Sequence, residues 1–360
     1  MATQVLLHPP VPAKPTGESS MPRMLRKNHV AGSALLAAAA LAAAFGAVPS
    51  AVAQENVSVR LKWLAQTQFA GVYVARAKGY YKNDGLNVTI NPGGPNLNAE
   101  SLVASGSDTF AVGGGIESSL SSADKKLPIV TLAMFHQRTP FVLVAMEDGP
   151  VKTLQDFKGK KITAFFTGTQ HTVSAMMAKA GLKPSDYSLT AQAVSMTPFL
   201  NREVDVAMTT LYNELVVVRN RGAKVRVFAP DDVGISVPRD TLITHQKMVA
   251  EKPKVVQGFI NATLRGWKYA IQHPVEATEI VMAAAPGLDK AHQLQMISEV
   301  SKLMLADGGT KQGLGYMDLE KYKLAQSILI DAKVISGPVN FDTTFLPRFW
   351  NAVPTADKKM

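Results

Sequence analysis

The chain has 360 residues, a formal charge of +10 and no cysteine. The lack of cysteine excludes disulfides, thiolate metal sites, iron–sulfur clusters, cysteine nucleophiles and a lipid-modified N-terminal cysteine. The 38 Lys and Arg residues form no basic run or arginine-rich helix. The positive charge therefore indicates a solvated surface and not a face that binds nucleic acid.

Residues 21–53 have the pattern of a secretory signal peptide. Three basic side chains precede residues 30–48, which are nearly all apolar, and Ala51-Val52-Ala53 supplies the small-x-small site at which signal peptidase cuts. A membrane anchor is the alternative, because residues 30–48 are just long enough to span a bilayer. The alanine-rich composition and the Ala-x-Ala site favour cleavage. We therefore expect a periplasmic, mature chain that begins at Gln54.

The mature chain keeps 34 Lys and Arg against 27 Asp and Glu, a formal charge of +7. Its length suits two modest domains or one large one. The first twenty residues fit no part of the export signal, so Met21 and Met24 are alternative starts to Met1. Residues 1–53 are therefore left out of the fold prediction.

The first part of the mature chain alternates between strand and helix patterns. Residues 57–61, 86–90 and 109–112 predict strands, and residues 69–82 and 99–105 predict helices. This β-α-β-α-β order indicates a parallel, doubly wound sheet covered by helices.

A second α/β set follows, and the chain becomes helical beyond Ile243. Further strands are predicted at 129–134, 141–145, 161–166, 189–193, 204–209 and 225–228. Helices are predicted from the opening residues 167–169 through 179, near 198–201 and after Tyr212. Apolar stripes predict later helices at 255–271, 274–285, 290–305 and 318–332.

Two such sets can be tandem domains or an interleaved pair, with the second lobe inserted into the first. Short connections near Met146 and Ala229, without a Pro/Ser-rich linker, favour the interleaved pair. We expect lobe 1 to hold residues 54–145 and 230–345, lobe 2 to hold residues 146–229, and residues 346–360 to form a tail.

Polar and aromatic side chains follow the predicted strands at equivalent ends. Open α/β sheets bind ligands at the carboxyl ends of their strands, where amide groups of the next helix point outward. Aromatic faces beside amides and a carboxylate suit a flat, polar heterocycle. The candidate ligand-binding residues are Trp63, Gln66, Gln68, Phe69, Gly114, Glu117, Thr167, Thr169, Tyr212, Asn213 and Glu214.

Each candidate also has a structural interpretation. Trp63 can belong to the core, and Gly113–Gly115 can be only a tight turn. Thr167 and Thr169 can be helix N-caps, and Glu214 can be a first-turn residue favoured by the helix dipole.

Catalytic and metal-binding signatures are absent from the sequence. The five histidines after position 53 form no HxH or HExxH motif, and there is no G-x-S-x-G, P-loop or Rossmann fingerprint. His136 and His171 are the two nearest the predicted cleft. The sequence therefore predicts no catalytic residue, metal or cofactor.

One family shares these motifs along nearly all of the mature chain. The stretch VSVRLKWLAQTQFAGVYVARAKGYYKNDGL at 57–86, the later DFKGKKI and the segment RGWKYAIQHP resemble the family that joins thiamine-pyrimidine synthase to periplasmic receptors of ABC importers. The resemblance implies a type II periplasmic binding protein of the α/β class. Such a protein has two doubly wound lobes joined by two crossovers, with a helical C-terminal segment and the ligand between the lobes.

Within that family, KWLAQTQFAG, the PGGPN turn and Tyr212-Asn213-Glu214 look most like receptors for riboflavin or a thiamine-pyrimidine precursor. By this resemblance Trp63 stacks on the ring, while Gln66, Gln68 and Glu214 bind its edge. The implied partners are an ABC permease and its ATPase, and the implied state is a monomer. A receptor for a sulfonate or taurine-type anion is an alternative.

The enzyme branch of the family is the other alternative. The synthase carries a lysine for pyridoxal phosphate and a histidine after the third strand, together with a Cys-rich iron motif. Here Gly113 or Gly114 and Glu117 stand at the corresponding positions, and cysteine is absent. This departure disfavours synthase activity.

Overall fold

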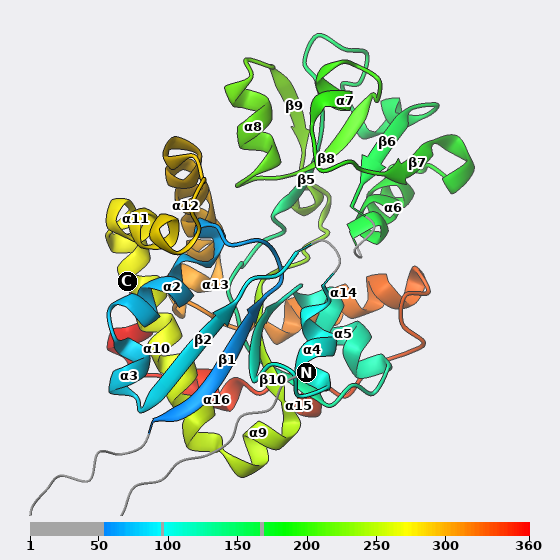
Figure 1. Ribbon diagram of the computed structural model, residues 1–360. Helices are drawn as coiled ribbons and strands as arrows, with labels where there is room; N and C mark the ends of the chain where they lie inside the picture. Colours follow the sequence, from blue (N-terminus) through cyan, green and yellow to red (C-terminus); the bar gives the residue numbers. More distant parts are fainter. Residues whose placement is uncertain (1–53, 95–96, 166–168) are drawn as a thin grey trace, which may run out of the picture. The chain divides into compact units, whose positions relative to one another are not determined.

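Two five-stranded sheets form the framework of the described chain (Figure 1). The computed structural model describes residues 54–94, 97–165 and 169–360, all within the compact unit Val52–Met360. The predicted signal peptide lies outside the described residues. The first sheet has the order β2-β1-β3-β10-β4 and the second the order β7-β6-β8-β5-β9.

Lobe 1 is built on the first sheet. Its strands are β1 (Glu55–Leu61), β2 (Leu86–Asn91), β3 (Phe110–Gly113), β4 (Ile129–Met134) and β10 (Thr241–His245). β1 pairs in parallel with β2 and β3, whereas β10 runs antiparallel to β3 and β4. Its helices up to the sheet's last strand are η1 (Thr67–Phe69), α2 (Ala70–Ala77), α3 (Tyr80–Asn83), α4 (Ala99–Ala104) and α5 (Ile116–Asp124).

Lobe 2 is built on the second sheet. Its strands are β5 (Phe141–Met146), β6 (Lys161–Ala164), β7 (Ser188–Ala191), β8 (Val206–Thr210) and β9 (Val225–Phe228). β6 is parallel to β7 and β8, and β5 is antiparallel to β8 and β9. Its helices are η2 (Leu154–Phe157), α6 (Thr169–Lys179), η3 (Pro184–Asp186), α7 (Thr197–Leu200) and α8 (Glu214–Asn220), and η4 (Pro230–Val233) lies in the second crossover.

The sheets are mixed and not purely parallel, which corrects the prediction from the β-α-β order. In each sheet the antiparallel member is a strand that enters from the other lobe: β5 follows the first crossover and β10 follows the second. The sequence did not predict β10. It predicted helices beyond Ile243, whereas this strand continues to His245. The crossovers are therefore residues 135–140 and 229–240.

This topology moves one expected lobe boundary. Residues 141–145 had been placed in lobe 1, but β5 pairs with β8 and β9 and so belongs to the second sheet. The first crossover thus precedes β5 and does not lie near Met146. The second crossover begins at Ala229, directly after β9.

Helices of the C-terminal part cover lobe 1. The longest, α10, buries the predicted apolar stripe, including Phe259, Leu264 and Trp267, and packs closely on α2. The predicted helix 69–82 is instead divided into the end of η1, α2 and α3, and the break between α2 and α3 occurs at Gly79, which takes a left-handed conformation with φ of 71°. The helices after β10 are α9 (Gln246–Glu251), α10 (Pro253–Gln272), α11 (Pro274–Ala284), α12 (Lys290–Leu305), α13 (Gly308–Lys311), α14 (Leu319–Asp331), α15 (Phe341–Thr344), α16 (Pro347–Asn351) and α17 (Thr355–Lys358).

The last fifteen residues are part of the lobe 1 core and not a separate tail. Phe349, Trp350 and Val353 are buried in the same cluster as β1 and α10. The Trp350 indole donates to the Leu314 carbonyl at 2.7 Å. The apolar patterning within 346–360 is too short to show this packing from the sequence.

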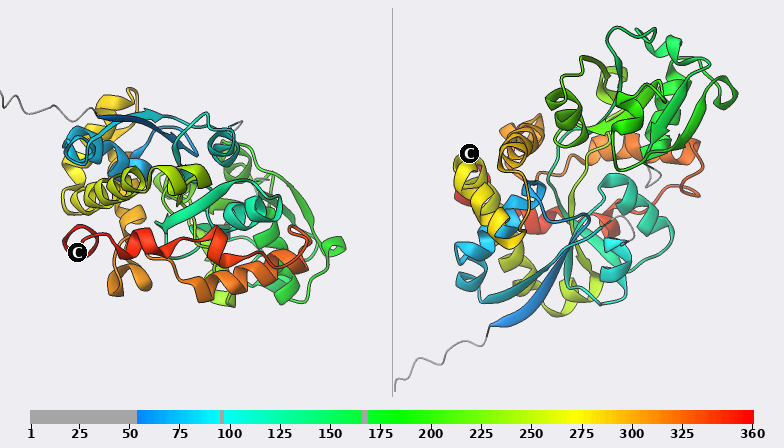
Figure 2. Two further views of the ribbon diagram at one scale, coloured as in Figure 1. Left: turned by 90° about the horizontal axis from the view of Figure 1, so that it is seen from below. Right: turned by 45° about the horizontal axis from the view of Figure 1, so that its top comes forward.

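One apolar cluster joins the two lobes at the crossovers. Met134 of β4, Leu143 of β5 and Val237 of the second crossover share it with side chains of α14. α14 also packs on α5, as Figures 1 and 2 show. This cluster forms the base from which the two sheets extend.

Candidate ligand-binding cleft

A cavity of about 560 Å³ is lined by residues of both lobes. Its lobe 1 wall follows β1, β2 and β3, and its lobe 2 wall follows β6, β7 and β8. These are the carboxyl ends of parallel strands, where open α/β sheets place ligands. The volume falls in the range of small-molecule sites, roughly 300–1,000 Å³. The lining residues are Lys62, Trp63, Gln66, Gln68, Gly94, Leu97, Asn98, Ala99, Glu100, Gly114, Ser118, Phe141, Phe165, Gln192, Val194, Thr210, Tyr212, Asn213, Glu214 and Arg239.

Most of the residues expected at the site line this cavity. They are Trp63, Gln66, Gln68, Gly114, Tyr212, Asn213 and Glu214. The segments that carry them are up to 151 positions apart in the sequence, so the fold brings them together.

The other expected residues lie elsewhere. Phe69 is 1% exposed in the lobe 1 core, because the η1 turn directs it inward. Glu117 is buried and pairs with Arg239, next to a separate cavity of about 400 Å³. Thr169 is buried, and its hydroxyl donates to the Phe165 carbonyl at 2.5 Å. Thr167 lies outside the described residues.

Aromatic side chains stand on both walls of the cavity. Trp63 is half-buried on the lobe 1 side, while Phe141, Phe165 and Tyr212 belong to the lobe 2 side. The rings of Phe141 and Phe165 are 6.3 Å apart and inclined by 56°. Such surfaces offer π faces to a flat ring system.

A pre-oriented carboxylate stands on the lobe 2 wall. One oxygen of Glu214 accepts from the Thr210 amide at 2.9 Å and from the Thr210 hydroxyl at 2.5 Å. The other oxygen accepts from the Asn213 amide at 2.9 Å. A carboxylate held this way retains lone pairs for N–H donors of a ligand.

α12 connects the residues of the two walls. Its Gln293 accepts the Thr67 amide at 2.8 Å and so anchors the turn between Gln66 and Gln68. His292 of the same helix lies 2.9 Å from the Asn213 side-chain oxygen, and Asn220 of α8 donates to Gln295 at 2.9 Å. These bonds hold α8 of lobe 2 to a helix of lobe 1 beside the cleft.

A buried ionic cluster lies beneath the cleft floor. Asp240 forms an ion pair with Lys62 and accepts from the Gln68 amide at 2.8 Å. The His136 ring nitrogen Nδ1 is 3.7 Å from the Asp240 carboxylate. His136 and Asp240 lie on different crossovers, which are joined by backbone bonds from Phe135 to Asp240 and from His136 to Arg239.

Burial and mutual charge set the protonation of this cluster. Burial lowers the pKa of His136 to about 4, so the ring is neutral at neutral pH. Burial also lowers the pKa of Lys62, and Asp240 partly offsets this effect. Burial alone would raise the pKa of Asp240, but His136, Lys62 and the Gln68 amide outweigh it, and the pKa is lowered. The carboxylate is therefore ionised and paired.

The glycine turn after β3 leaves room for the backbone of the second crossover. Gly115 has φ of 123°, and a Cβ there would stand 2.7 Å from the Pro238 carbonyl oxygen. The second crossover thus occupies the space that the glycine leaves, and the Ile116 amide donates to Pro238 at 3.1 Å. Gly115 therefore has the structural reason to be glycine that a tight turn supplies.

Both cationic side chains in the cleft wall have acidic partners. Lys62 is paired with Asp240, and Arg239 is paired with Glu117 and lies over the Phe141 ring. Burial lowers the pKa of Arg239 to about 10, which leaves it charged at neutral pH. Glu100 and Glu214 add two carboxylates to the wall, so the cleft has no surplus of positive charge.

Several side chains in or beside the cleft are not among the residues that the sequence predicts there. Lys62 is adjacent to Trp63 at the same strand end and could have been found from that position. Asp240 and Arg239 precede a strand that the sequence did not predict. The sequence places Phe141 in lobe 1, whereas β5 belongs to the second sheet, and Phe165 follows β6, which ends at Ala164 and not at 166 as predicted. Their proximity depends on crossovers that no local pattern encodes.

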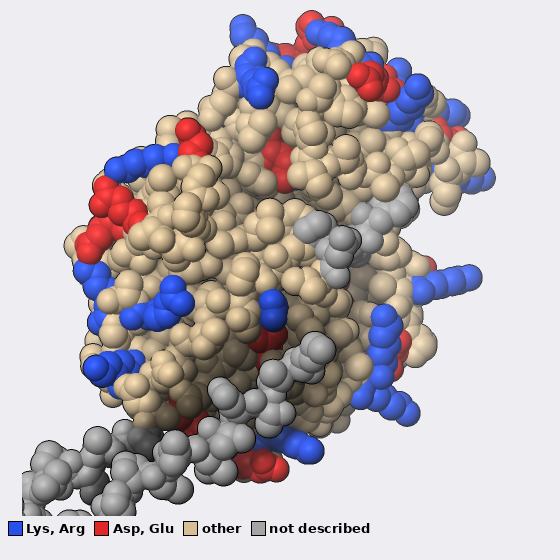
Figure 3. Space-filling view, viewed as in Figure 1, with Lys and Arg blue, Asp and Glu red and all other residues tan. Residues whose placement is uncertain are grey.

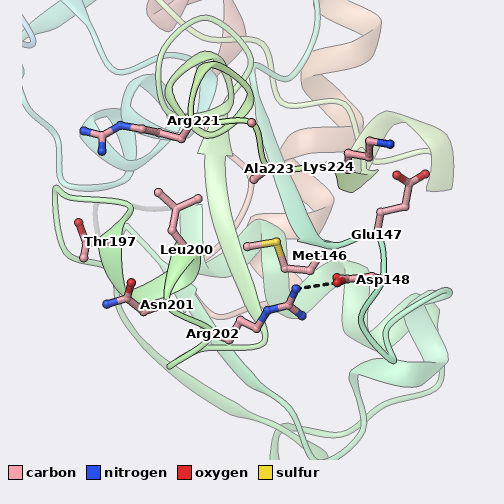
Figure 4. A pocket seen from close by; sticks show the side chains of 11 residues that line it. Met146, Glu147, Asp148, Thr197, Leu200, Asn201, Arg202, Arg221, Ala223 and Lys224 are labelled. Carbon is pink, nitrogen blue, oxygen red and sulfur yellow. Dashed lines mark hydrogen bonds and ion pairs between the residues drawn. The ribbon is translucent and has the colours of Figure 1, made fainter.

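A larger hollow of about 740 Å³ lies on lobe 2, away from the strand ends that carry the cleft (Figure 4). Exposed charged side chains surround it, including the Arg202–Asp148 pair at 2.7 Å, and none of its described lining residues is aromatic. Figure 3 shows Lys and Arg spread over the visible face, beside Asp and Glu at several places. The aromatic and amide groups favour the interlobe cleft as the site.

Within the described residues, no cluster of three or more His, Asp or Glu residues could hold a metal ion. Within the same ranges, no helix is both long and apolar enough to cross a membrane.

Comparison with known proteins identifies relatives of this architecture. Residues 66–277 match the family model described as NMT1/THI5 like. The riboflavin-binding protein RibY of Chloroflexus aurantiacus is 26% identical over 321 residues, covering 86% of this chain and 90% of RibY. The 4-amino-5-hydroxymethyl-2-methylpyrimidine phosphate synthase of Legionella pneumophila is 24% identical over 248 residues, 65% of this chain and 75% of the synthase.

Solved structures agree with the fold. The periplasmic aliphatic sulphonate-binding protein SsuA of Escherichia coli superposes with a TM-score of 0.63 at 14% identity, covering 81% of this chain and 92% of SsuA. At this identity the similarity concerns the fold alone. It confirms the predicted α/β fold of a type II periplasmic binding protein.

Proposed function

The chain belongs to the NMT1/THI5-like family, and from this premise we propose that it is the exported substrate-binding component of an ABC importer. It captures a flat nitrogen heterocycle between its lobes and delivers it to a membrane permease driven by an ATPase. The observation that carries this proposal is the interlobe cleft, with aromatic side chains on both walls and oriented acceptors around them.

The ligand class follows from the cleft's size and polarity. A cavity of about 560 Å³ offers more room than a single pyrimidine ring fills, and it suits a fused ring system with a polar side chain. Stacking on Trp63 and acceptors at Gln66 and Glu214 fit a ring with N–H groups along its edge. RibY, a relative whose match covers 86% of this chain, is named for binding riboflavin. We therefore place a riboflavin-like ligand first and a thiamine-pyrimidine precursor second.

An anion receptor fits less well. A sulfonate needs uncommitted donors and net positive charge, because a buried anion must be paired and hydrogen-bonded. In this cleft Lys62 and Arg239 already have carboxylate partners, and Glu214 would repel an anion.

The enzyme alternative has one observation in its favour, the cleft residue Lys62, whose pKa is lowered by burial. However, Lys62 is committed to Asp240. The positions that would carry the synthase's cofactor lysine and histidine hold glycine and Glu117, which pairs with Arg239. These residues do not fit pyridoxal phosphate or an iron centre.

A thermal-shift panel tests the proposed class. The mature chain is heated with riboflavin, formylaminopyrimidine, thiamine, ethanesulfonate and pyridoxal phosphate, each in separate wells. A ligand at a hundred times its Kd stabilises the native state by about 2.7 kcal/mol. We expect riboflavin, or failing that a pyrimidine, to raise the Tm. A shift with ethanesulfonate alone would contradict the proposal, as would a Lys62-dependent aldimine absorbance with pyridoxal phosphate.

A further inference from the structure

A directional chain of hydrogen bonds leads from the second crossover to the cleft. The Gln66 amide donates to the Gln68 side-chain oxygen at 2.7 Å, and the Gln68 amide donates to Asp240 at 2.8 Å. The three side chains are more than nine-tenths buried, with exposed fractions of 8%, 2% and 1%. Gln66 and Gln68 also line the cleft.

The charge on Asp240 fixes the direction of this chain. An ionised carboxylate can only accept hydrogen bonds, and Lys62 pairs with this one. Gln68 must therefore turn its NH₂ group toward Asp240, since its oxygen would be repelled there. The Gln68 side-chain oxygen then faces Gln66, so the Gln66 NH₂ group must donate to it. Each amide has one oxygen, so the Gln66 oxygen is left for another partner.

Among the described residues, the Gln66 oxygen takes part in no protein hydrogen bond. Gln66 lines the cleft, so this oxygen is open to a ligand, and a ligand that supplies an N–H donor there gains a hydrogen bond in place of one to solvent. Trp63 stands three residues earlier on the same wall and would hold the plane of the ring.

We propose that Asp240 is a positioning residue that makes Gln66 present a carbonyl acceptor to the ligand, and so selects rings with an N–H donor at that edge. This inference rests on the proposed function, and it specifies the ligand as one with an imide, lactam or exocyclic amino N–H. Asp240 acts through Gln68 and Gln66 and does not line the cavity itself.

The backbone at Asp240 makes a matched variant possible. Asp240 has φ of 61°, a left-handed conformation that Asn tolerates nearly as well as Asp. Asp240→Asn therefore keeps the shape and removes the charge that sets the direction. Lys62→Met in the same chain removes the ammonium that would otherwise be left unpaired in a buried site. The double variant is neutral at both positions and lets Gln68 bond in either orientation.

The binding test compares riboflavin with its N3-methyl derivative, which lacks the imide N–H. We expect the wild type to prefer riboflavin by about tenfold, the equivalent of roughly 1.4 kcal/mol for one hydrogen bond. The double variant should reduce this ratio to less than about threefold, even if both affinities fall. An unchanged ratio would overturn the proposal, because a merely structural role would lower both affinities equally. A wild type without any preference would overturn it too.

A second measurement needs no ligand and separates this inference from the proposed function. Side-chain amide NMR signals of Gln66 and Gln68 are followed by hydrogen exchange in the free protein. We expect protected amide protons on both residues in the wild type and loss of protection in the double variant. Protection that does not depend on Asp240 would overturn the hydrogen-bond chain. If protection behaves as expected but no heterocycle binds, the proposed function fails while the orientation of Gln66 stands.

Discussion

Individual side chains in this protein owe their roles to partners far away in the sequence. Trp63 and Glu214 lie on opposite walls of one cavity, and Asp240 holds Gln68 from 172 positions away. Each interaction is ordinary, but their combination forms a cleft with π faces and oriented acceptors. The class of ligand that the cavity can bind therefore depends on these individual side chains.

Trp63→Ala should reduce heterocycle affinity by roughly 10- to 100-fold, because stacking contributes on the order of 1–3 kcal/mol. Riboflavin fluorescence, quenched on stacking against the indole, measures both affinity and contact. The free energy of unfolding should change by less than about 1 kcal/mol, since Trp63 is only half-buried. Leu64→Ala, at a neighbouring side chain that is 54% exposed, is the matched control and should bind normally. Equal affinities for the two variants would exclude Trp63 from the site.

His136 should make stability depend on pH. Its pKa is about 4 in the folded chain, below the ordinary value of 6.5, so the unfolded chain takes up the proton first. As pH falls from 6.5 to 4, the free energy of unfolding should therefore decrease, by roughly 3 kcal/mol in total. His136→Gln should remove that part of the slope in urea titrations, whereas His273→Gln, at an exposed histidine, should retain it. If the free energy of unfolding of wild type and His136→Gln depended on pH in the same way, the low pKa of His136 would be contradicted.

At the scale of elements, local patterns predicted most helices and strands, and connectivity was the difficult part. The ranges of β4, β9 and α12 agree with the prediction because each is a continuous apolar or amphipathic run whose start is marked by Pro128, Lys224 and Asp289, respectively. β10 was missed because a five-residue strand before a long helix carries little periodicity of its own. Its place between β3 and β4 depends on pairing across more than a hundred residues.

The turn between β3 and α5 has a steric requirement that can be measured. Gly115→Ala should lower the free energy of unfolding by about 2–4 kcal/mol, because alanine disfavours φ of 123° and its Cβ would meet the Pro238 carbonyl. Gly337→Ala is the control, since no atom lies within 4 Å of its added Cβ. Chemical denaturation of both variants gives the comparison. A Gly115→Ala chain as stable as the control would show that the crossover does not press on this turn.

Part of the candidate site could be predicted from the sequence because, like the fold, it follows from the order of elements along the chain. The rule that ligands bind at strand ends selected Trp63, Gln66, Tyr212 and Glu214, which line the cavity, because the rule needs only the order of strands and polar residues. The rule could not distinguish Phe69, which the η1 turn directs into the core, from the residues that line the cavity. Nor could it find Asp240, whose role depends on how the second crossover folds against the first.

For the whole molecule, two lobes joined by two crossovers allow a ligand to stabilise one arrangement of the lobes over another. A ligand does so only by binding that arrangement more tightly. The crossovers meet at Asp240 and His136, directly beneath the cleft floor. The two crossovers therefore meet next to the side chains to which the proposed function assigns the ligand.

The most direct test of the proposed function is a calorimetric titration of the mature chain with riboflavin, followed by formylaminopyrimidine and ethanesulfonate. The account predicts saturable binding of one heterocycle per chain, with a Kd in the micromolar range or below, and a loss of at least tenfold in affinity in Trp63→Ala. No saturable binding of either heterocycle, or binding of ethanesulfonate alone, would contradict it.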